Sequence, residues 1–407
     1  MTHPRPDPVS QRSRPPSSSV SGAGEPVPTV PGESVQDESG VAILPGEQPA
    51  DEALLDTDAT LWAVVMAGGI GSRFWPLSSA TRPKPLLPLS NERPLIADTV
   101  ARLAPLVSPE RVLVVTSADI SDALHAAIPQ VPSRNMLVEP HPMGTAAALA
   151  WAAHEVARRA GPETAFCTVH ADLAVGLPQE FRYAVRRAAQ VAVREEALVV
   201  VGARPTRPET GFGYLLPGEP LDGSNGTDVN GACRVVRFVE KPGNILAESL
   251  ITEGALWSTG TFVWRARVVL EELERAPEIA PALEALAAGD LPAFAGGVQH
   301  VSLDRALLER SERVVVLPGD FVWDDIGTWA SLRRARELDD QGNGAVGPAY
   351  FAESSGNLVH TERGPVVLYG VDSLVVVSLD GFTFVSTLER AGELGPLLRE
   401  LPGEFRP

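Results

Sequence analysis

The stretch Ala67-Gly-Gly-Ile-Gly-Ser-Arg-Phe-Trp-Pro-Leu-Ser78, which continues to Arg82-Pro-Lys-Pro85, decides how the chain folds around its site. It follows an apolar run from Leu61 to Met66 that is typical of a strand buried on both faces. Glycines let backbone N–H groups approach a phosphate because no Cβ stands in the way. Arg73 and Lys84 would add positive charge. The segment therefore predicts a phosphate-binding loop at the end of a strand.

Two common nucleotide loops do not match this segment. A P-loop needs Gly-Lys-Ser/Thr, where the chain has Gly71-Ser72-Arg73. The dinucleotide fingerprint needs a third glycine at the position that Phe74 occupies. A tight turn without a ligand is the alternative for Gly68 and Gly69, and the two basic side chains in the same short segment argue against it.

On the C-terminal side of this segment, patterns typical of buried strands alternate with patterns typical of helices. Strands are predicted at 111–116, 165–170 and 197–202, and helices at 95–106, 144–160 and 181–194. This alternation predicts a three-layer α/β fold with right-handed crossovers between parallel strands. Ligands bind at the carboxyl ends of the strands in such folds. That rule selects Gly68, Asp172 and the segment after Gly202.

The two ends of the chain differ from this central part. Residues 1–58 are rich in Pro, Ser, Glu, Gly and Asp, which predicts a disordered N-terminal tail before an α/β domain at 59–338. A surface loop is expected at 218–231. Near the C-terminus, short strands at 357–360, 365–369, 373–378 and 382–386 predict a small β unit over 345–407, closed by a helix at 390–401.

Composition limits the partners. The net charge of −18 argues against nucleic acid and anionic membranes, which are also negative. A phosphate-bearing substrate would then be bound by a few Lys and Arg side chains, backbone N–H groups and a metal ion. No apolar run is long enough to span a membrane, and two cysteines form no disulfide framework or zinc signature. A cytoplasmic protein is the expectation.

The loop and five later segments, in the same order, resemble the nucleotide-diphospho-sugar pyrophosphorylases, and most closely the mannose-1-phosphate guanylyltransferase branch. The similarity extends over about residues 61–400. The five later segments are Glu139-Pro-His-Pro-Met-Gly-Thr-Ala146, Val169-His-Ala-Asp172, Pro205-Thr-Arg-Pro-Glu-Thr-Gly-Phe-Gly-Tyr214, Val239-Glu-Lys-Pro242 and Phe321-Val-Trp-Asp-Asp-Ile-Gly-Thr-Trp329.

The resemblance implies a Rossmann-like, GT-A-like domain with a short C-terminal left-handed β-helix that serves packing and homodimer contacts. It also implies roles for particular residues. Arg73, Lys84 and Lys241 would be catalytic; Gly68, Gly69, Gly71, Glu139 and Thr145 would bind the nucleotide; Gly213, Glu240 and Ser258 would bind the sugar; and Asp172 and Asp325 would bind the metal.

The implied reaction joins GTP and mannose 1-phosphate, giving GDP-mannose and pyrophosphate. Both substrates are anions, so Mg²⁺ is the expected cofactor, and it commonly uses only one or two carboxylates. The nucleophile is already a phosphate anion, so catalysis should rest on positioning and charge stabilisation. Asp324, adjacent to Asp325, cannot face the same ion and is expected to be solvated. For Asp172 a strand-end cap, and for Lys241 a surface lysine, are the structural alternatives.

Three departures from the branch leave the choice of base and sugar open. Met143-Gly144 stands where the branch has Arg-Asn, Leu173 where it has His, and Ser258 where it has Asn. One alternative is therefore the same chemistry with UTP or dTTP and glucose 1-phosphate. Another is a regulatory paralogue that binds nucleotide sugars without turnover, against which the intact basic and acidic residues argue.

Overall fold

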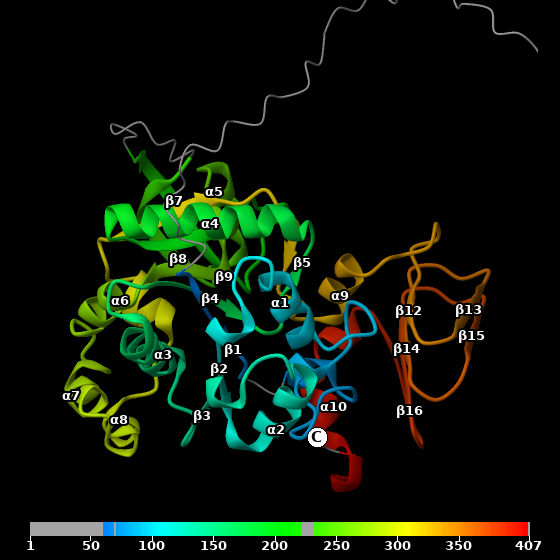
Figure 1. The fold of residues 1–407 in the computed structure, drawn as a ribbon. Helices are drawn as coiled ribbons and strands as arrows, with labels where there is room; N and C mark the ends of the chain where they lie inside the picture. The colour runs from blue at the N-terminus through cyan, green and yellow to red at the C-terminus, as the bar shows by residue number, and fades with distance from the viewer. Residues whose placement is uncertain (1–59, 69–70, 222–230, 406–407) are drawn as a thin grey trace, which may run out of the picture. The chain divides into compact units, whose positions relative to one another are not determined.

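The computed structural model describes residues 60–68, 71–221 and 231–405 (Figure 1). The predicted tail at 1–58, Gly69 and most of the loop predicted at 218–231 lie outside these residues. The start of that loop is corrected, because Gly218 belongs to a strand that continues to Pro220. Among the helices of the described residues, none combines the length and apolarity that a membrane crossing requires.

A nine-stranded sheet forms the centre of the fold, in the order β3-β2-β1-β4-β9-β6-β10-β8-β7. Its strands are β1 Trp62–Met66, β2 Val112–Ser117, β3 Met136–Glu139, β4 Ala165–His170, β6 Leu198–Ala203, β7 Gly213–Pro220, β8 Cys233–Glu240, β9 Leu256–Arg265 and β10 Val314–Pro318. The four strands predicted first, β1, β2, β4 and β6, are all present. The sheet is mixed, however, because β9 lies between β4 and β6 and is antiparallel to both.

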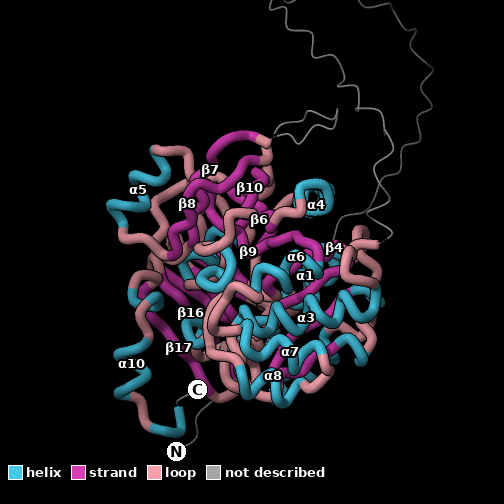
Figure 2. The backbone as a smooth tube through the Cα atoms, turned by 90° about the vertical axis from the view of Figure 1, so that its left-hand side faces the viewer, coloured by secondary structure: helices cyan, strands magenta, loops and turns pink. Residues whose placement is uncertain are grey.

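Helices cover both faces of this sheet (Figures 1 and 2). The α-helices of the described residues are α1 Leu95–Leu103, α2 Ala118–Ala127, α3 Thr145–Ala160, α4 Pro178–Glu195, α5 Asn244–Thr252, α6 Ala266–Leu273, α7 Leu283–Ala287, α8 Leu291–Gly297, α9 Trp329–Ala335 and α10 Gly395–Glu400, of which α9 and α10 pack with the C-terminal strands. The three helices predicted in this part correspond to α1, α3 and α4. Helix α3 ends at Gly161, whose φ of 101° is accessible because glycine has no Cβ.

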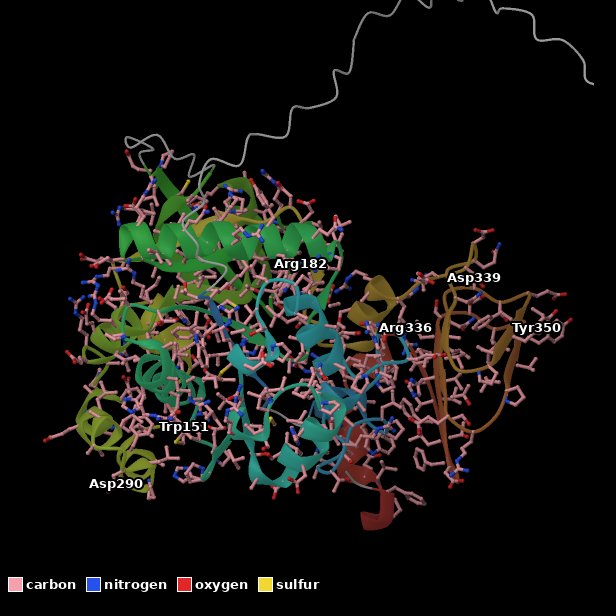
Figure 3. All side chains as sticks on the ribbon, viewed as in Figure 1. Trp151, Arg182, Asp290, Arg336, Asp339 and Tyr350 are labelled. Carbon is pink, nitrogen blue, oxygen red and sulfur yellow. The ribbon has the colours of Figure 1, made fainter. Side chains whose placement is uncertain are left out.

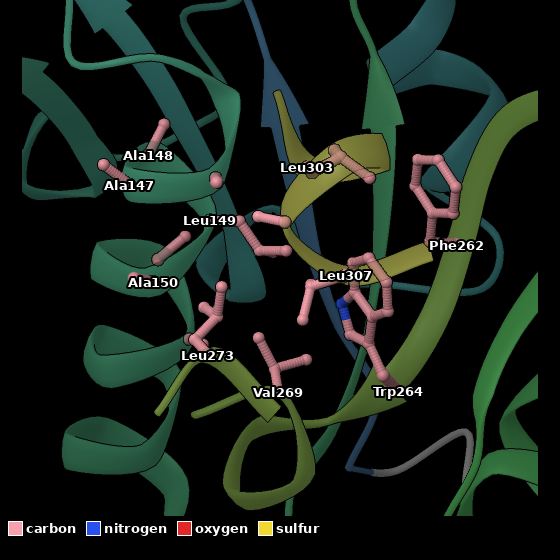
Figure 4. Close-up of a cluster of buried hydrophobic side chains, with 14 of the residues drawn as sticks. Ala147, Ala148, Leu149, Ala150, Phe262, Trp264, Val269, Leu273, Leu303 and Leu307 are labelled. Carbon is pink, nitrogen blue, oxygen red and sulfur yellow. The ribbon is translucent and has the colours of Figure 1, made fainter. Parts of the chain in front are cut away.

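Successive side chains of the central strands point to opposite faces of the sheet and pack into two separate hydrophobic cores. Val64 and Met66 of β1 contribute to one core with α3 and α6, and Ala63 and Val65 to the other with α1, α2 and α4. Figure 4 shows part of the first core, where Leu149, Trp264 and Leu273 converge from different elements. This period of two is the expected pattern for a strand buried on both faces.

The C-terminal residues form two small sheets with parallel pairs. One sheet has the order β12-β14-β16-β17 and the other pairs β13 with β15. The strands are β12 Gly344–Val346, β13 Ala349–Ala352, β14 Leu358–Thr361, β15 Val366–Tyr369, β16 Leu374–Leu379 and β17 Phe382–Thr387. The four predicted strands are confirmed. The predicted closing helix is shorter than expected: a 3-10 turn at Arg390–Gly392 precedes α10.

A third apolar cluster joins the glycine loop to this C-terminal unit. Trp75 contacts Phe382 and Phe384, each with ring centroids 5.4 Å apart, and Phe74 contacts Trp329 at 5.3 Å. Arg336, labelled in Figure 3, is buried between the two parts. Its Nε donates to the carbonyl of Leu89 at 2.7 Å and its Nη1 to the carbonyl of Val359 at 3.1 Å. The back of the loop is therefore packed against the C-terminal strands.

Candidate active site

Lys84 joins the two aspartates that the sequence selects. It begins a 3-10 turn, Lys84–Leu86, and its side chain is 9% exposed. Its Nζ donates to Asp172 Oδ2 at 2.9 Å and to the backbone carbonyl of Asp325 at 2.7 Å. Three of the predicted residues, from distant parts of the sequence, thus meet at one point.

A short ribbon sets the positions of both aspartates. Asp172 comes just before β5, Ala174–Val175, and Asp325 comes just after β11, Trp323–Asp324. The two strands pair antiparallel, with Asp324 opposite Ala174. The end of one strand therefore lies beside the start of the other, which brings Asp172 and Asp325 to the same edge.

Asp325 is held in an enclosed environment. Burial raises the pKa of its carboxyl to about 6, and the nearby Lys84 opposes that rise. The backbone N–H of Gly327 donates to Asp325 Oδ1 at 2.9 Å, which favours the ionised form. A carboxylate that is costly to ionise when alone is a good partner for a cation.

The carboxylates of Asp172 and Asp325 are oxygen donors, the ligand type that Mg²⁺ takes in proteins. Within residues 60–68, 71–221 and 231–405, no group of three or more His, Cys, Asp or Glu side chains could hold a metal. Mg²⁺ is commonly held by one or two carboxylates, with waters and substrate phosphates completing the octahedron. Asp172 and Asp325 would be those carboxylates, and the Lys84 ammonium already lies against Asp172.

Asp324 does not match the expectation that it is solvated. Its side chain is buried, and its Oδ2 accepts from Arg334 Nε at 3.0 Å and lies 3.6 Å from Arg207 Nη2. The prediction considered only which face the side chain takes, and it could not include Arg207, which comes from a segment far away in the sequence.

The glycine loop is built against Lys84. Gly71 has φ of +68°, and a Cβ there would lie 2.5 Å from Lys84 Cβ. Its carbonyl accepts from Ser78 Oγ at 2.7 Å and from the Phe74 N–H at 3.0 Å. Gly68 is exposed with nothing near its Cβ position, and the Arg73 side chain is exposed. Both therefore lie where an incoming ligand could reach them.

The segment expected beside the base is fixed through its backbone. Glu139 ends β3 and accepts from the Met143 N–H at 3.3 Å, and burial raises the pKa of its carboxyl. Gly144 has φ of +89°, and a Cβ there would meet the backbone of Val301 at 2.8 Å. The Thr145 hydroxyl accepts from the Leu303 N–H at 2.9 Å. Glu139 and Thr145 thus shape this segment, whatever else they bind.

The predicted sugar residues lie along β7, β8 and β9. Gly213 pairs with Glu240, and a Cβ on Gly213 would lie 2.8 Å from Phe238 and 2.9 Å from Glu240 Oε2. Lys241 has φ of 48° and donates from Nζ to Glu240 Oε1 at 2.6 Å. Ser258 pairs with Gly202 at the carboxyl end of β6, beside a register shift. These residues share the edge at which the sheet rule places ligands.

Two further ionisable residues belong to this region. Burial and the charge of Glu240 raise the pKa of Asp304 to about 6, while Lys241 opposes the rise. Burial lowers the pKa of His170. The charge of Asp172 opposes this shift, and the charge of Lys84 adds to it. No motif marked Asp304, which stands in the plain stretch Ser302-Leu-Asp-Arg305. His170 carried a positional signal, since it comes two residues before Asp172.

Comparison with known proteins agrees with this geometry. The family model described as nucleotidyl transferase matches residues 62–342. The mannose-1-phosphate guanylyltransferase of Sinorhizobium fredii is 32% identical over 353 residues, which are 84% of this chain and 67% of that protein. ManC of Salmonella typhimurium, a mannose-1-phosphate guanylyltransferase, is 32% identical over 85% of this chain and 74% of its own length.

Solved structures give the same result. The structure named mannose-1-phosphate geranyltransferase, from Thermus thermophilus, has a TM-score of 0.76 and 34% identity, covering 84% of this chain and 98% of that one. The mannose-6-phosphate isomerase of Helicobacter pylori, at 20% identity and a TM-score of 0.51, shares the fold alone. The chain belongs to the nucleotidyl transferase family, in the branch of the mannose-1-phosphate guanylyltransferases.

Proposed function

We propose that this chain is a mannose-1-phosphate guanylyltransferase, which converts GTP and mannose 1-phosphate into GDP-mannose and pyrophosphate. The observation that carries the proposal is the meeting of Lys84, Asp172 and Asp325 at one edge of the sheet. The similarity to curated guanylyltransferases over 84% of the chain supports the choice of substrates.

In the proposed reaction, a phosphate oxygen of mannose 1-phosphate attacks the α-phosphorus of GTP. A new P–O bond forms as the bond between the α-phosphorus and the bridging oxygen to the β-phosphate breaks, and pyrophosphate leaves with the electron pair. No proton transfer is required of the protein. A bound Mg²⁺, held by Asp172 and Asp325, would reduce the repulsion between the two anionic substrates.

The side chains then have distinct tasks. Lys84 and Arg73 neutralise the triphosphate, while the glycine loop presents backbone N–H groups to it. Gly213 leaves room for the sugar against the backbone, and Glu240 accepts hydrogen bonds from its hydroxyls. Lys241 is exposed at 63% and free to reach the sugar phosphate once it leaves Glu240.

The same chemistry with UTP or dTTP and glucose 1-phosphate is the second candidate, and one observation favours it. Met143 stands where the guanylyltransferase branch has arginine, and its side chain is 1% exposed within the core. It therefore cannot contact a base as an arginine would. Recognition of guanine would rest on the backbone of this segment.

A substrate panel tests the proposal. Pyrophosphate release by the purified chain is measured with GTP, UTP or dTTP, each with mannose 1-phosphate or glucose 1-phosphate, in Mg²⁺. We expect the highest kcat/KM for GTP with mannose 1-phosphate, by at least about tenfold. Equal or greater release with UTP or dTTP would refute the guanylyl assignment, and no release with any pair would favour a regulatory paralogue.

Three finer features complete the proposal. The parallel pairs of the C-terminal unit are consistent with a short left-handed β-helix, and we propose that this unit mediates a homodimer. A cytoplasmic location agrees with the chemistry of a nucleotide-sugar enzyme. Size-exclusion chromatography with light scattering tests the dimer, and cell fractionation tests the location.

A further inference from the structure

A cavity of about 990 Å³ lies next to the candidate active site without including it. Its walls come from α1, the first turns of α4, the segments 203–207 and 319–324, and α9. Lys84, Asp172, Lys241 and Asp325 do not line it. Their chain neighbours Leu173 and Asp324 do.

The cavity is basic in a strongly acidic chain. Six arginines line it, against three aspartates, although the whole chain carries a net charge of −18. The arginines are Arg93, Arg102, Arg182, Arg204, Arg207 and Arg334. They come from four separate segments, so no single surface helix explains their meeting. Guanidinium groups gathered in this way are suited to phosphate, which they bind with paired hydrogen bonds.

Two of these guanidinium groups, Arg102 and Arg204, have few or no partners among the described residues, whereas Arg93 and Arg334 form ion pairs with Asp98 and Asp324. Arg102 is 8% exposed, yet its side chain makes one hydrogen bond to a described residue, from Nη2 to the Leu173 carbonyl at 3.3 Å. Burial lowers its pKa to about 10. The exposed Arg204 side chain has no hydrogen-bond or ion-pair partner among the described residues. Arg207, by contrast, is paired with Glu209 and Asp324. A guanidinium has five N–H donors, and leaving buried ones unpaired is costly.

The cavity also has an apolar side. Leu177 is 56% exposed and Val322 is 66% exposed, and both line it. Arg207 and Trp257 also line it, and the Arg207 Cζ lies 5.0 Å from the centroid of the Trp257 ring. Exposed apolar side chains beside a cluster of arginines suit a ligand with both a phosphate and a flat or apolar part.

The cavity is connected to the catalytic edge by direct contacts. Arg102 holds the carbonyl of Leu173, the residue after Asp172. Arg334 and Arg207 hold Asp324, the residue before Asp325. An anion that engages these arginines competes with both contacts, so it would act on the two backbone segments that position the aspartates.

We propose that this cavity is a second ligand site, which binds a phosphate-bearing small molecule of the nucleotide class and modulates turnover through the segments at Leu173 and Asp324. Binding does not depend on the function proposed above, whereas the effect on turnover rests on it. Arg182 and Arg204 line the cavity and have no role in the reaction proposed above; Arg182 also donates from Nη1 to the Arg102 carbonyl at 3.2 Å.

The test uses GDP as the probe on the full chain. Isothermal titration calorimetry should show two binding events for the wild type, one at each site. In the double variant Arg182→Ala/Arg204→Ala one event should weaken by at least about tenfold, while the other remains. The matched control Arg234→Ala/Arg390→Ala removes two exposed arginines outside the cavity and should keep both events. If the double variant has a lowered Tm, the single variant Arg204→Glu, at an exposed position, replaces it.

Turnover measurements and a titration with orthophosphate in place of GDP complete the test. At saturating GTP and mannose 1-phosphate, GDP should change the turnover of the wild type and not that of the double variant, whose basal turnover stays within about twofold. A single binding event in every variant would overturn the proposal. So would a site that orthophosphate fills as tightly as GDP, since the nucleotide class would then be wrong. Arginine-dependent binding without turnover would contradict only the proposed function.

Discussion

The ammonium group of Lys84 lies 2.9 Å from the carboxylate of Asp172, in a site where the lysine side chain is 9% exposed and the aspartate 28%. The pair links the end of the glycine loop to the end of β4. A lysine held in this way neutralises an aspartate in the absence of substrate, and in the proposed reaction it would also contact a phosphate. Its removal should therefore affect catalysis far more than binding of the sugar.

Replacing Lys84 with methionine keeps most of the apolar stem and removes the charge. We expect kcat to fall by about 10²–10³, the usual effect of losing one well-placed donor to a developing charge. Pyrophosphate release at saturating substrates measures this. Lys84→Arg should recover part of the loss, and a kcat within threefold of wild type for Lys84→Met would contradict the assigned role.

Gly71 and Gly68 offer a matched pair of substitutions in the same loop. Gly71→Ala places a Cβ 2.5 Å from the Lys84 side chain at a φ of +68°, so it should lower both stability and turnover, with a stability cost of about 1–3 kcal/mol. Gly68→Ala meets nothing within 4 Å. Thermal melting and turnover of the two variants should therefore differ, and equal behaviour would show that the loop is not held against Lys84.

Gly213→Ala tests the sugar side of the site. The added Cβ would stand 2.9 Å from Glu240 Oε2 and 2.8 Å from Phe238, so either Glu240 or the sugar must move. We expect KM for mannose 1-phosphate to rise by about 10-fold or more, with KM for GTP changing little. In Gly211→Ala the nearest atom is 3.5 Å away, and that control should bind the sugar phosphate normally.

The raised pKa of Asp325 predicts how activation by magnesium depends on pH. Its pKa is raised to about 6 by burial, so below that pH a proton competes with the metal for the carboxylate. The Mg²⁺ concentration for half-maximal activity should rise as pH falls from 7.5 to 5.5. An Asp290→Asn control, at a helix cap far along the chain, should behave as wild type. A half-maximal concentration that does not change with pH would contradict the role of Asp325 as a metal ligand.

His360 predicts the acid sensitivity of the fold. Burial lowers its pKa from 6.5 to about 4. Between pH 4 and pH 6.5 this histidine is therefore protonated in the unfolded chain and neutral in the folded chain. The contribution of His360 to the free energy of unfolding is therefore complete above pH 6.5. It decreases as the pH falls toward 4, by at most about 3 kcal/mol. Urea unfolding at pH 7 and pH 4.5 measures the loss. It should shrink in His360→Gln and persist in His141→Gln, whose histidine is exposed.

The parts of the fold that could be predicted are those set by local sequence. The apolar runs became β1, β2, β4 and β6 because a strand buried on both faces needs continuous apolar residues. The insertion of β9 between β4 and β6 could not be predicted, since strand order depends on contacts across nearly a hundred residues. A mixed sheet and a parallel one give similar local patterns.

The same division applies to the site. Motif positions identified Lys84, Asp172 and Asp325, which the structure brings together. The burial of Asp324 and the partners of Arg102 depend on side chains that meet only after folding, so no spacing in the sequence revealed them. The basic cavity is hidden for the same reason, because its arginines are scattered from residue 93 to residue 334.

The packing of Trp75 on Phe382 and Phe384 has a consequence for how the enzyme is made. The glycine loop is synthesised early, but the aromatic side chains that support its back leave the ribosome about three hundred residues later. The loop cannot reach its final packing until nearly the whole chain has emerged. A product cut short before Phe382 would therefore lack the aromatic contacts that support the back of the glycine loop.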